Sequence, residues 1–307
     1  MNILCLTQIG HVKGTYELLN SIGNLSYCPR ISKEQVQEEI EDIDILYLNP
    51  NKQDYLLDES ILGGTNVKII VTVSRGTNHI DMDYCEKAGI HVIHLNKDPV
   101  AAKNSATAEH ALGLTLALLK KLPESLASIK DGKWDCGPFT GHQLSSLVVG
   151  VVGLGALGSM YAKYCTAIGS TVMSATRQIP HSLKAVLVCC DVISLHVPLT
   201  QETYHMIDDK AVSMLKGAFI VNCARGSVVD EHAIVKGLKS GKIKGYATDV
   251  LEDEQNISES PIVQAMHEGL NVLITPHVAG TCFESAKVAH FRAIELLKNH
   301  IAKSDLT

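Results

Sequence analysis

The sequence LVVGVVGLGALG contains three glycines with the spacing of a phosphate-binding turn. Gly153, Gly155 and Gly158 follow a run of valines and lead into the helix-like sequence ALGSMYAKYCTAIG. The first glycine permits a tight turn, the second lets the backbone approach a pyrophosphate, and the third lets helix and strand pack closely. The spacing alone also fits a purely structural turn, but its place between a strand and a helix favours a dinucleotide-binding site.

The residues after the next strand indicate which dinucleotide binds. A site for NAD usually has an Asp or Glu about 20 residues beyond the glycines, where it binds the ribose 2′-hydroxyl. Here the strand Thr171–Ala175 leads into Thr176 and Arg177, and neither Asp nor Glu occurs between Asp135 and Asp191. A hydroxyl and a guanidinium suit a 2′-phosphate. The sequence therefore favours NADP(H); the alternative is that Arg177 is solvated and NAD(H) binds with weak ribose contacts.

Three later segments place charged or titratable groups at the ends of apolar runs. Arg225 follows the run Phe219–Asn222, and His277 follows the run Val272–Thr275. Asp249 ends the run Tyr246–Asp249, and Glu254 lies beyond it. In a parallel sheet with helices on both faces, ligands bind at the carboxyl ends of the strands. These segments are therefore expected to bring polar groups to the edge of the sheet at which the glycine turn lies.

The elements that must position these groups alternate between short apolar strands and helices along the whole chain, which predicts an α/β fold with parallel sheets. The strand candidates are Asn2–Leu6, Ile43–Leu48, Lys68–Val73, His91–His94, Leu147–Val152, Thr171–Ala175, Asp191–Val197, Phe219–Asn222, Tyr246–Asp249 and Val272–Thr275. The helix candidates are Ser32–Glu41, Asp81–Ala88, Ala106–Lys121 and Phe283–Lys303.

The helix Ala106–Lys121 is apolar on every face up to its terminal lysines, which predicts burial on all sides. Such a helix would be central to its domain or would lie in a subunit interface. The segment Phe283–Lys303 has instead the pattern of an amphipathic helix.

The composition is that of a globular protein with 307 residues, 46% hydrophobic residues and a formal net charge of −6. No long basic run occurs, so nucleic acid and anionic membrane are not expected as partners. The N-terminus lacks the pattern of a signal peptide, and the longest apolar stretch, Leu147–Met160, is interrupted by glycines. The nine scattered cysteines show no metal-ligand spacing, which favours thiols in a reducing cytoplasm and no metal site.

The motifs together resemble the D-isomer-specific 2-hydroxyacid dehydrogenase family. They occur in family order over residues 65–285 and are SRGTNHID (74–81), TAEHA (107–111), GLGALG (153–158), SLHVPLTQET (194–203), VNCARGSVVDE (221–231), TDVLEDE (248–254) and TPHVAG (275–280). The resemblance implies hydride transfer between a nicotinamide cofactor and a 2-keto or 2-hydroxy acid.

The resemblance also implies roles for individual residues. Arg225 would bind the substrate carboxylate, His277 would exchange a proton with the carbonyl oxygen, and Glu254 would orient His277 and favour its imidazolium form. The backbone at Arg75 and Gly76 would contact the substrate carboxylate. The residues expected to contact the cofactor are Thr107, Gly153, Gly155, Ala156, Leu157, Gly158, Thr176, Arg177, His196, Val197, Pro198, Cys223, Ala224 and Asp249.

Each catalytic candidate has a plainer alternative when it is taken alone. Arg225 could be a surface ion-pair partner, His277 a loop histidine bonded to backbone, and Glu254 part of a solvated acidic run. Two features also depart from the family pattern. The region between Arg177 and Asp191 is short, so one strand–helix unit of the sheet is expected to be reduced or missing. The usual proline after the acidic run is replaced by Gln255.

The resemblance implies two Rossmann-like domains, a cofactor domain at 99–281 inserted into a flavodoxin-like substrate domain formed by 1–98 and 282–307. Catalysis would occur in a cleft that excludes water on closure. Family members are typically homodimers joined through the cofactor domain, and the helix near 106–121 is the candidate interface.

Three functions compete. The first is reduction of a small 2-keto acid such as glyoxylate or hydroxypyruvate. The second is phosphoglycerate dehydrogenation, which the sequence SRGTNHIDMDYCEKAGI resembles; at this length we expect no appended regulatory domain. The third is nucleotide sensing by a corepressor-like binding protein, which the presence of Arg225, Glu254 and His277 disfavours.

Overall fold

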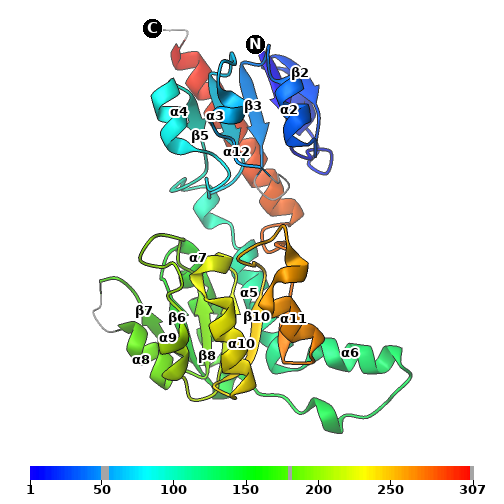
Figure 1. Ribbon diagram of the computed structural model, residues 1–307, viewed down its shortest axis with the longest axis vertical. Coiled ribbons are helices and arrows are strands. Elements are labelled where there is room, and N and C mark those ends of the chain that lie inside the picture. Colours follow the sequence, from blue (N-terminus) through cyan, green and yellow to red (C-terminus); the bar gives the residue numbers. More distant parts are fainter. Residues whose placement is uncertain (50–54, 179–181, 305–307) are drawn as a thin grey trace. The chain divides into compact units, whose positions relative to one another are not determined.

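The computed structural model describes residues 1–49, 55–178 and 182–304. The chain divides into two compact units, one formed by the described residues of 1–104 and 281–307 and the other by residues 105–280 (Figure 1). The second unit is thus inserted between the two parts of the first. We expected the divisions after residues 98 and 281, and they fall after residues 104 and 280.

The first unit contains a parallel sheet in the order β2-β1-β3-β4-β5. This is the flavodoxin-like order 2-1-3-4-5 that was expected. Its strands are β1 (Asn2–Cys5), β2 (Asn24–Tyr27), β3 (Ile45–Leu48), β4 (Ile69–Thr72) and β5 (His91–Ile93), and its helices are α1 (Thr15–Asn20), α2 (Lys33–Glu39), α3 (Glu59–Leu62), α4 (Met82–Ala88) and α12 (Phe283–Ser304).

Alternate side chains of these strands point to opposite faces of the sheet, and each face has its own core. Ile45 and Tyr47 pack with α1 and α12 on one face, whereas Leu46 and Leu48 pack with α2, α3 and α4 on the other. The amphipathic pattern of 283–303 therefore marks a helix that covers one face of a sheet formed mostly by the other end of the chain (Figure 1).

The second unit contains a parallel sheet in the order β11-β10-β9-β8-β6-β7. Its strands are β6 (Val148–Val152), β7 (Thr171–Ala175), β8 (Val192–Leu195), β9 (Ala218–Asn222), β10 (Ile243–Thr248) and β11 (Val272–Ile274). Its helices are α5 (Ala106–Leu119), α6 (Leu122–Lys130), α7 (Ala156–Ile168), α8 (Ser182–Cys189), α9 (Asp209–Ser213), α10 (Glu231–Lys239) and α11 (Pro261–His267). This confirms the expected fold of two parallel-sheet α/β domains.

The second sheet is shortened at one edge. In the common dinucleotide-binding order 3-2-1-4-5-6, a third strand lies outside the second. Among the residues described between β7 and β8, which exclude 179–181, only the helix α8 is found, so β7 forms the edge of the sheet. This agrees with the expectation of a reduced strand–helix unit.

The helix α5 differs from its prediction in two ways. It ends at Leu119 rather than Lys121, because Lys121 has a left-handed backbone (φ 51°) before α6 begins. Only one side of α5 is buried, since Ala108, Ala111 and Leu118 pack into the core of the second unit while Glu109 is exposed. The prediction of burial on every side is therefore wrong within this chain.

The helix α6 and the residues after it extend away from the rest of the second unit (Figure 1). No residue of α6 is buried, and the apolar side chains Leu122, Leu126 and Ile129 are exposed. Trp134 follows with 91% of its surface exposed. A patch of this kind on a monomer commonly marks a contact surface. None of the helices in the described ranges is long and apolar enough to cross a membrane.

Candidate active site

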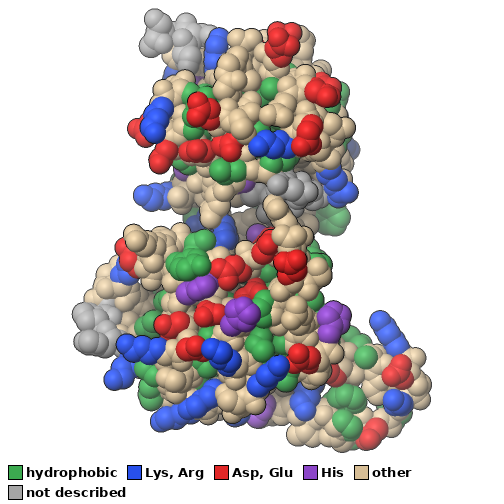
Figure 2. Space-filling view, in the orientation of Figure 1, with side chains coloured by type: hydrophobic (Ala, Val, Ile, Leu, Met, Phe, Trp, Pro, Cys, Tyr) green, Lys and Arg blue, Asp and Glu red, His purple; other side chains and the backbone are tan. Residues whose placement is uncertain are grey.

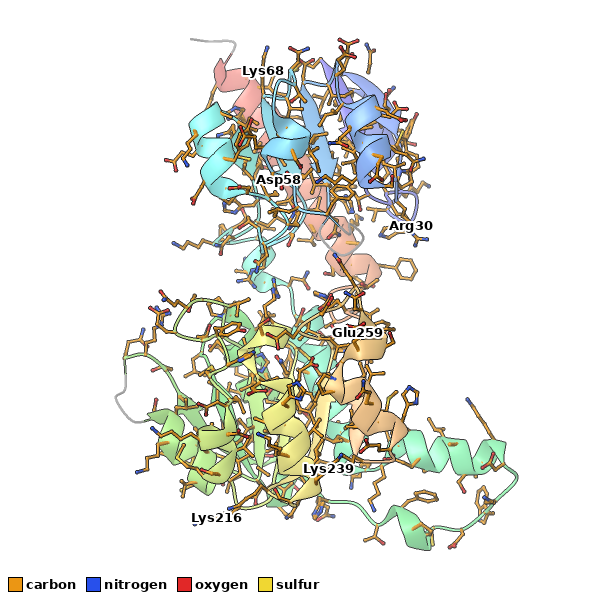
Figure 3. The ribbon with its side chains drawn as sticks, viewed as in Figure 1. Arg30, Asp58, Lys68, Lys216, Lys239 and Glu259 are labelled. Carbon is orange, nitrogen blue, oxygen red and sulfur yellow. The ribbon has the colours of Figure 1, made fainter. Side chains whose placement is uncertain are left out.

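The predicted catalytic side chains all follow strands of the second unit. Arg225 comes after β9, Glu254 after β10 and His277 after β11, and these three strands are neighbours in a parallel sheet. Their carboxyl ends therefore meet at one edge, which we call the rim. Many Lys and Arg side chains of this unit gather toward its lower end in the view (Figure 2). Figure 3 labels Glu259 near the rim and Lys216 and Lys239 at the opposite end.

The histidine and the carboxylate of the predicted pair are in contact. His277 Nδ1 lies 2.7 Å from Glu254 Oε2, and the two side chains are 31% and 43% exposed. With Nδ1 occupied, the other ring nitrogen, Nε2, is the one available for proton exchange with a ligand. His277 also has φ 52°, a left-handed conformation that is uncommon for a residue with a side chain.

The backbone around His277 is held by Asp249, which is buried at the end of β10. Its Oδ1 accepts hydrogen bonds from Thr275 Oγ1 at 2.6 Å and from the N–H of Val278 at 2.9 Å. Its Oδ2 accepts the N–H of Ala279 at 2.8 Å, and its carbonyl oxygen accepts the N–H of His277 at 2.9 Å. The carboxylate thus fixes the strained loop; its expected contact with the nicotinamide stays a prediction.

The loop that carries Arg225 is fixed by Asn222, a fully buried residue at the end of β9. Asn222 Oδ1 accepts the N–H of Ala224 at 3.0 Å, and its Nδ2 donates to the carbonyl oxygen of Arg225 at 3.0 Å. The guanidinium of Arg225 is half-buried and donates to the carbonyl oxygen of Ala224 at 2.6 Å. The planar guanidinium of Arg225 therefore lies on a rigid loop, and it has more N–H donors than this hydrogen bond uses.

The glycine turn has the geometry that each glycine was expected to provide. Gly153 has φ 94°, and a Cβ atom there would lie 2.7 Å from the carbonyl oxygen of His196. A Cβ atom on Gly158 would lie 1.9 Å from the carbonyl oxygen of Gly153, so α7 can pack this closely only with glycine. At Gly155 a Cβ atom would meet nothing within 4 Å.

This open side of Gly155 adjoins the N-terminus of α7, where Ala156 and Leu157 form the first helical turn. Helix α7 has 13 residues and no side-chain cap, so its first N–H groups are available to an anion. These residues fit a dinucleotide pyrophosphate.

Neutral and apolar groups line the rest of the rim. Burial lowers the pKa of His196 to about 4, so the imidazole is uncharged, and its Nε2 lies 2.9 Å from Ser194 Oγ. Burial raises the pKa of Cys223 far above its usual range, so this side chain remains a thiol. Ala224 is buried beside it, whereas Val197 is half-buried and Pro198 exposed. Such a surface suits an uncharged ring.

The residues at the tip of β7 contact neighbouring side chains. The N–H of Thr176 donates to Ser182 Oγ at 3.1 Å. The guanidinium of Arg177 is exposed and donates to Glu202 Oε2 at 3.0 Å. Hydrogen bonding to Thr200 and the nearby Arg177 charge lower the pKa of Glu202, so this pair is ionised at neutral pH.

The remaining predicted residues lie on α5 and in the first unit. Thr107 is half-buried in the first turn of α5. Arg75 and Gly76 follow β4, and the N–H of Gly76 donates to Ser74 Oγ at 3.0 Å. Arg75 is exposed. Both residues belong to the first unit.

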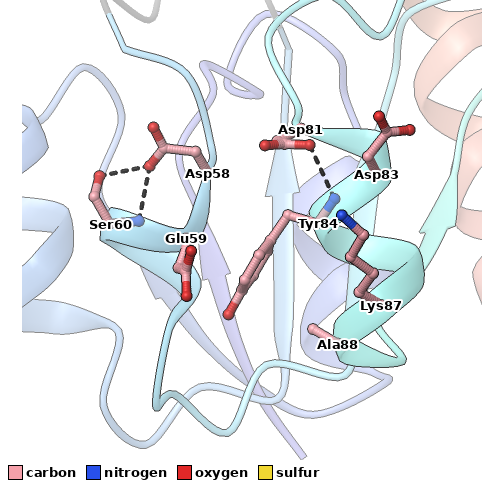
Figure 4. A pocket seen from close by; sticks show the side chains of 8 residues that line it. All are labelled: Asp58, Glu59, Ser60, Asp81, Asp83, Tyr84, Lys87 and Ala88. Atoms are coloured by element: carbon pink, nitrogen blue, oxygen red, sulfur yellow. Dashed lines mark hydrogen bonds between the residues drawn. The ribbon is translucent and has the colours of Figure 1, made fainter.

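A hollow between α3 and α4 of the first unit contains none of the predicted site residues (Figure 4). It is lined by Asp58, Glu59, Ser60, Asp81, Asp83, Tyr84, Lys87 and Ala88. Two of its carboxylates cap helices, since Asp58 accepts the N–H of Ser60 at 2.9 Å and Asp81 accepts that of Tyr84 at 2.9 Å. Within the described ranges, no group of three His, Cys, Asp or Glu side chains is arranged to hold a metal.

Three supporting residues were missed by the sequence reasoning. Asn222 ends an otherwise apolar strand, and this single polar residue was the available signal. His110 lies on α5, with its Nε2 2.9 Å from Thr275 Oγ1, and it belongs to the quoted motif TAEHA. His205 contacts Glu252 at 2.9 Å, and nothing in its local sequence indicates that pairing.

The glycine turn, the uncharged groups around His196 and Cys223 and the His–carboxylate pair fit a dinucleotide-dependent oxidoreductase. The family described as D-isomer specific 2-hydroxyacid dehydrogenase, NAD binding domain, matches residues 112–279. The chain belongs to this family, whose members are NAD(P)-dependent oxidoreductases acting on 2-hydroxy acids.

Similar proteins include a glyoxylate reductase of Thermofilum pendens, 34% identical over 88% of this chain and 83% of that protein. A D-3-phosphoglycerate dehydrogenase of Methanocaldococcus jannaschii is 32% identical over 92% of this chain, which spans only 54% of that protein. The crystal structure of an Aquifex aeolicus D-lactate dehydrogenase with NAD and lactic acid matches with a TM-score of 0.79 at 28% identity. That match covers 100% of this chain and 96% of the other.

Proposed function

We propose that this protein interconverts a small 2-keto acid and the corresponding D-2-hydroxy acid. The observation that carries the proposal is the 2.7 Å contact between His277 Nδ1 and Glu254 Oε2, on the same sheet edge as the glycine turn and Arg225. A bound nicotinamide cofactor would supply or accept the hydride. The protein groups then have to hold the acid and move one proton.

Each of these tasks falls to one side chain. Arg225 binds the substrate carboxylate through the two-pronged geometry of its guanidinium. His277 gives its Nε2 proton to the carbonyl oxygen during reduction and takes it back during oxidation. Glu254 accepts the Nδ1–H, which fixes the ring and stabilises the imidazolium that is the proton donor. The expected contact between the backbone at Arg75 and Gly76 and the substrate carboxylate stays a prediction.

The cofactor preference follows from the tip of β7. Arg177 and Thr176 would bind a ribose 2′-phosphate, and Arg177 has donors beyond the one that contacts Glu202. NADP(H) is therefore favoured over NAD(H). We expect Arg177→Gln to raise the Kd of NADPH about tenfold and to leave that of NADH unchanged. Fluorescence titration checks this, and equal effects on both cofactors would argue for NAD(H).

The candidate substrates are small 2-keto acids, because glyoxylate and hydroxypyruvate reductases are among the relatives. A second candidate is 3-phosphohydroxypyruvate, because phosphoglycerate dehydrogenases are also among them. A corepressor-like binding protein would not need the His277–Glu254 pair.

We also propose a homodimer formed through the second unit. The exposed apolar side chains of α6 and Trp134 support it and shift the expected interface from α5 toward α6. A cytoplasmic location fits the nine cysteines, all of which are free. Leu126→Glu with Ile129→Glu should yield a monomer in sedimentation experiments, whereas Lys130→Glu on the same helix should not.

One assay tests the proposed reaction. Purified protein is mixed with NADPH or NADH and with glyoxylate, hydroxypyruvate, pyruvate or 3-phosphohydroxypyruvate, and loss of nicotinamide absorbance is followed. We expect turnover with at least one unphosphorylated acid. Turnover with the phosphorylated acid alone would favour the second candidate, and no turnover with any acid would refute both.

A further inference from the structure

The residues that present Glu254 have no regular secondary structure. Glu252, Asp253 and Glu254, here called the acidic segment, follow β10 and are exposed. An exposed carboxylate on an unrestrained segment samples many rotamers, and a lone surface ion pair contributes little to its order. The next residue is Gln255, which does not restrict the backbone as a proline would. Other contacts must therefore hold Glu254 against His277.

The first restraint is a turn built by Asp253. Its Oδ1 accepts the N–H groups of Gln255 at 3.0 Å and Asn256 at 3.2 Å, and its Oδ2 accepts Asn256 Nδ2 at 2.8 Å. These hydrogen bonds, led by that of the Asn256 side chain, lower the pKa of Asp253 and keep it ionised at neutral pH. A proline at 255 would lack the first N–H, so this turn takes the place of a proline ring.

The second restraint comes from His205, in the loop after β8. His205 Nε2 lies 2.9 Å from Glu252 Oε1 and 3.1 Å from Oε2. The backbone of His205 is itself fixed, with φ 47° and its N–H bonded to the carbonyl oxygen of Ser227 at 2.8 Å. The ring of Tyr204 stacks on that of His205, with centroids 4.0 Å apart, and its hydroxyl donates a longer hydrogen bond to Glu252 Oε1 at 3.4 Å.

The backbone of the segment is held on its other sides. The N–H of Glu252 donates to Glu231 Oε1 at 3.0 Å, and Glu231 Oε2 accepts Ser260 Oγ at 2.7 Å. A Cβ atom on Gly226 would lie 2.0 Å from the carbonyl carbon of Leu251 and 2.3 Å from the nitrogen of Glu252. The segment therefore packs directly on the loop that begins at Arg225.

We propose that His205 is a positioning residue, which holds Glu252 in place and thereby keeps the Glu254 carboxylate in contact with Nδ1 of His277. The inference rests on the proposed function, because it gives His205 a role in proton transfer through Glu254 and His277. His205 itself contacts neither acid nor cofactor. Since it joins the loop after β8 to the segment after β10, it links three neighbouring loops of the rim.

A double-mutant cycle tests this role. His205→Leu should lower kcat about tenfold and leave KM for the cofactor unchanged, because a misplaced proton donor slows the chemical step. In a Glu254→Gln background the same change should cause no further loss, since the effect passes through Glu254. His205→Gln, which can still donate to Glu252, should restore most of the activity, and His232→Leu, at an exposed histidine on α10, serves as the matched control. An unchanged kcat, or an equal loss in both backgrounds, would overturn the proposal.

A second measurement does not need turnover. The ¹⁵N NMR signal of His277 Nδ1 reports its hydrogen bond to Glu254. His205→Leu should move that signal toward its position in Glu254→Gln, whereas His232→Leu should leave it in place. If the protein reduced no acid, the proposed function would fail while this signal still decided the role of His205. A signal that His205→Leu does not move would overturn that role.

Discussion

At the scale of single residues, Asp249 holds the loop around His277 in place, a role that its position in the sequence does not reveal. Its side chain is 1% exposed and accepts hydrogen bonds from Thr275, Val278 and Ala279, on both sides of His277. A buried carboxylate with this many donors holds a loop in one conformation. The left-handed backbone of His277 is stable only because its surroundings impose it.

The first prediction concerns this carboxylate. Asp249→Asn replaces one acceptor oxygen by an NH₂ group, which cannot accept the N–H of Val278 or Ala279. We expect a loss of about 1–3 kcal/mol in the free energy of unfolding of the second unit, together with reduced kcat. Urea denaturation and steady-state assays measure both effects. Asp131→Asn, at an exposed ion pair, is the control; equal stability of the two variants would contradict the role of Asp249.

At the scale of elements, the strands at the centres of the sheets were predicted well, whereas β2, one edge strand of the first sheet, was not predicted. The buried strands β3, β4 and β8 contain almost only large apolar residues, so their signal is strong. β2 has the sequence NLSY and only one partly buried residue. Its formation depends on pairing with β1, a long-range contact that local sequence does not encode.

The catalytic site likewise contains residues that the sequence predicted and residues that it did not. The glycine turn, Arg225 and His277 lie in contiguous motifs, so both their position and their partners could be anticipated. His205 and Glu252 are 47 residues apart in the chain and meet only because β8, β9 and β10 are neighbours in the sheet. The apolar residues of α5 indicated burial, but they did not reveal which side of the helix the chain leaves uncovered.

The second prediction separates two glycines of one turn. Gly155→Ala places a methyl group in open space where the pyrophosphate would lie, so stability should be unchanged while the Kd of NADPH rises at least about tenfold. Gly158→Ala drives a methyl group into the carbonyl oxygen of Gly153 and should lower the free energy of unfolding by about 1–3 kcal/mol. Thermal melting and fluorescence titration distinguish the two.

Gly113→Ala, on the exposed side of α5, is the control for both variants. A methyl group there meets nothing within 4 Å and should be neutral or stabilising. If Gly155→Ala bound NADPH as tightly as the wild type, the pyrophosphate would not lie against this turn.

At the scale of the whole molecule, each unit contains a histidine whose pKa is lowered strongly by burial. Burial lowers the pKa of His196 in the second unit and of His290 in the first to about 4. His290 is 2% exposed, its Nδ1 lies 2.8 Å from the hydroxyl of Tyr47, and His11 is its titratable neighbour. As the pH falls, an unfolded chain binds protons at these histidines near pH 6.5, whereas the folded chain binds them only at lower pH.

The third prediction follows from that difference. Because the folded pKa is the lower one, the stability of each unit is complete above about pH 6.5 and falls as the pH drops toward 4. For His290 the loss amounts to about 2 kcal/mol at about pH 5. His290→Gln should flatten the pH dependence of the melting of the first unit, whereas the exposed His232→Gln should not. Calorimetry at several pH values measures this; an unchanged slope in His290→Gln would contradict it.

The most direct test of the account compares wild type with His277→Asn in the reduction of a 2-keto acid by NADPH. Asparagine keeps a polar side chain near the rim but cannot deliver a proton as imidazolium does. We predict that kcat falls by a factor of about 100 to 10,000 while the Kd of NADPH changes less than about twofold. A His277→Asn protein that reduces the acid at the wild-type rate would show that the His277–Glu254 pair is not the acid–base centre.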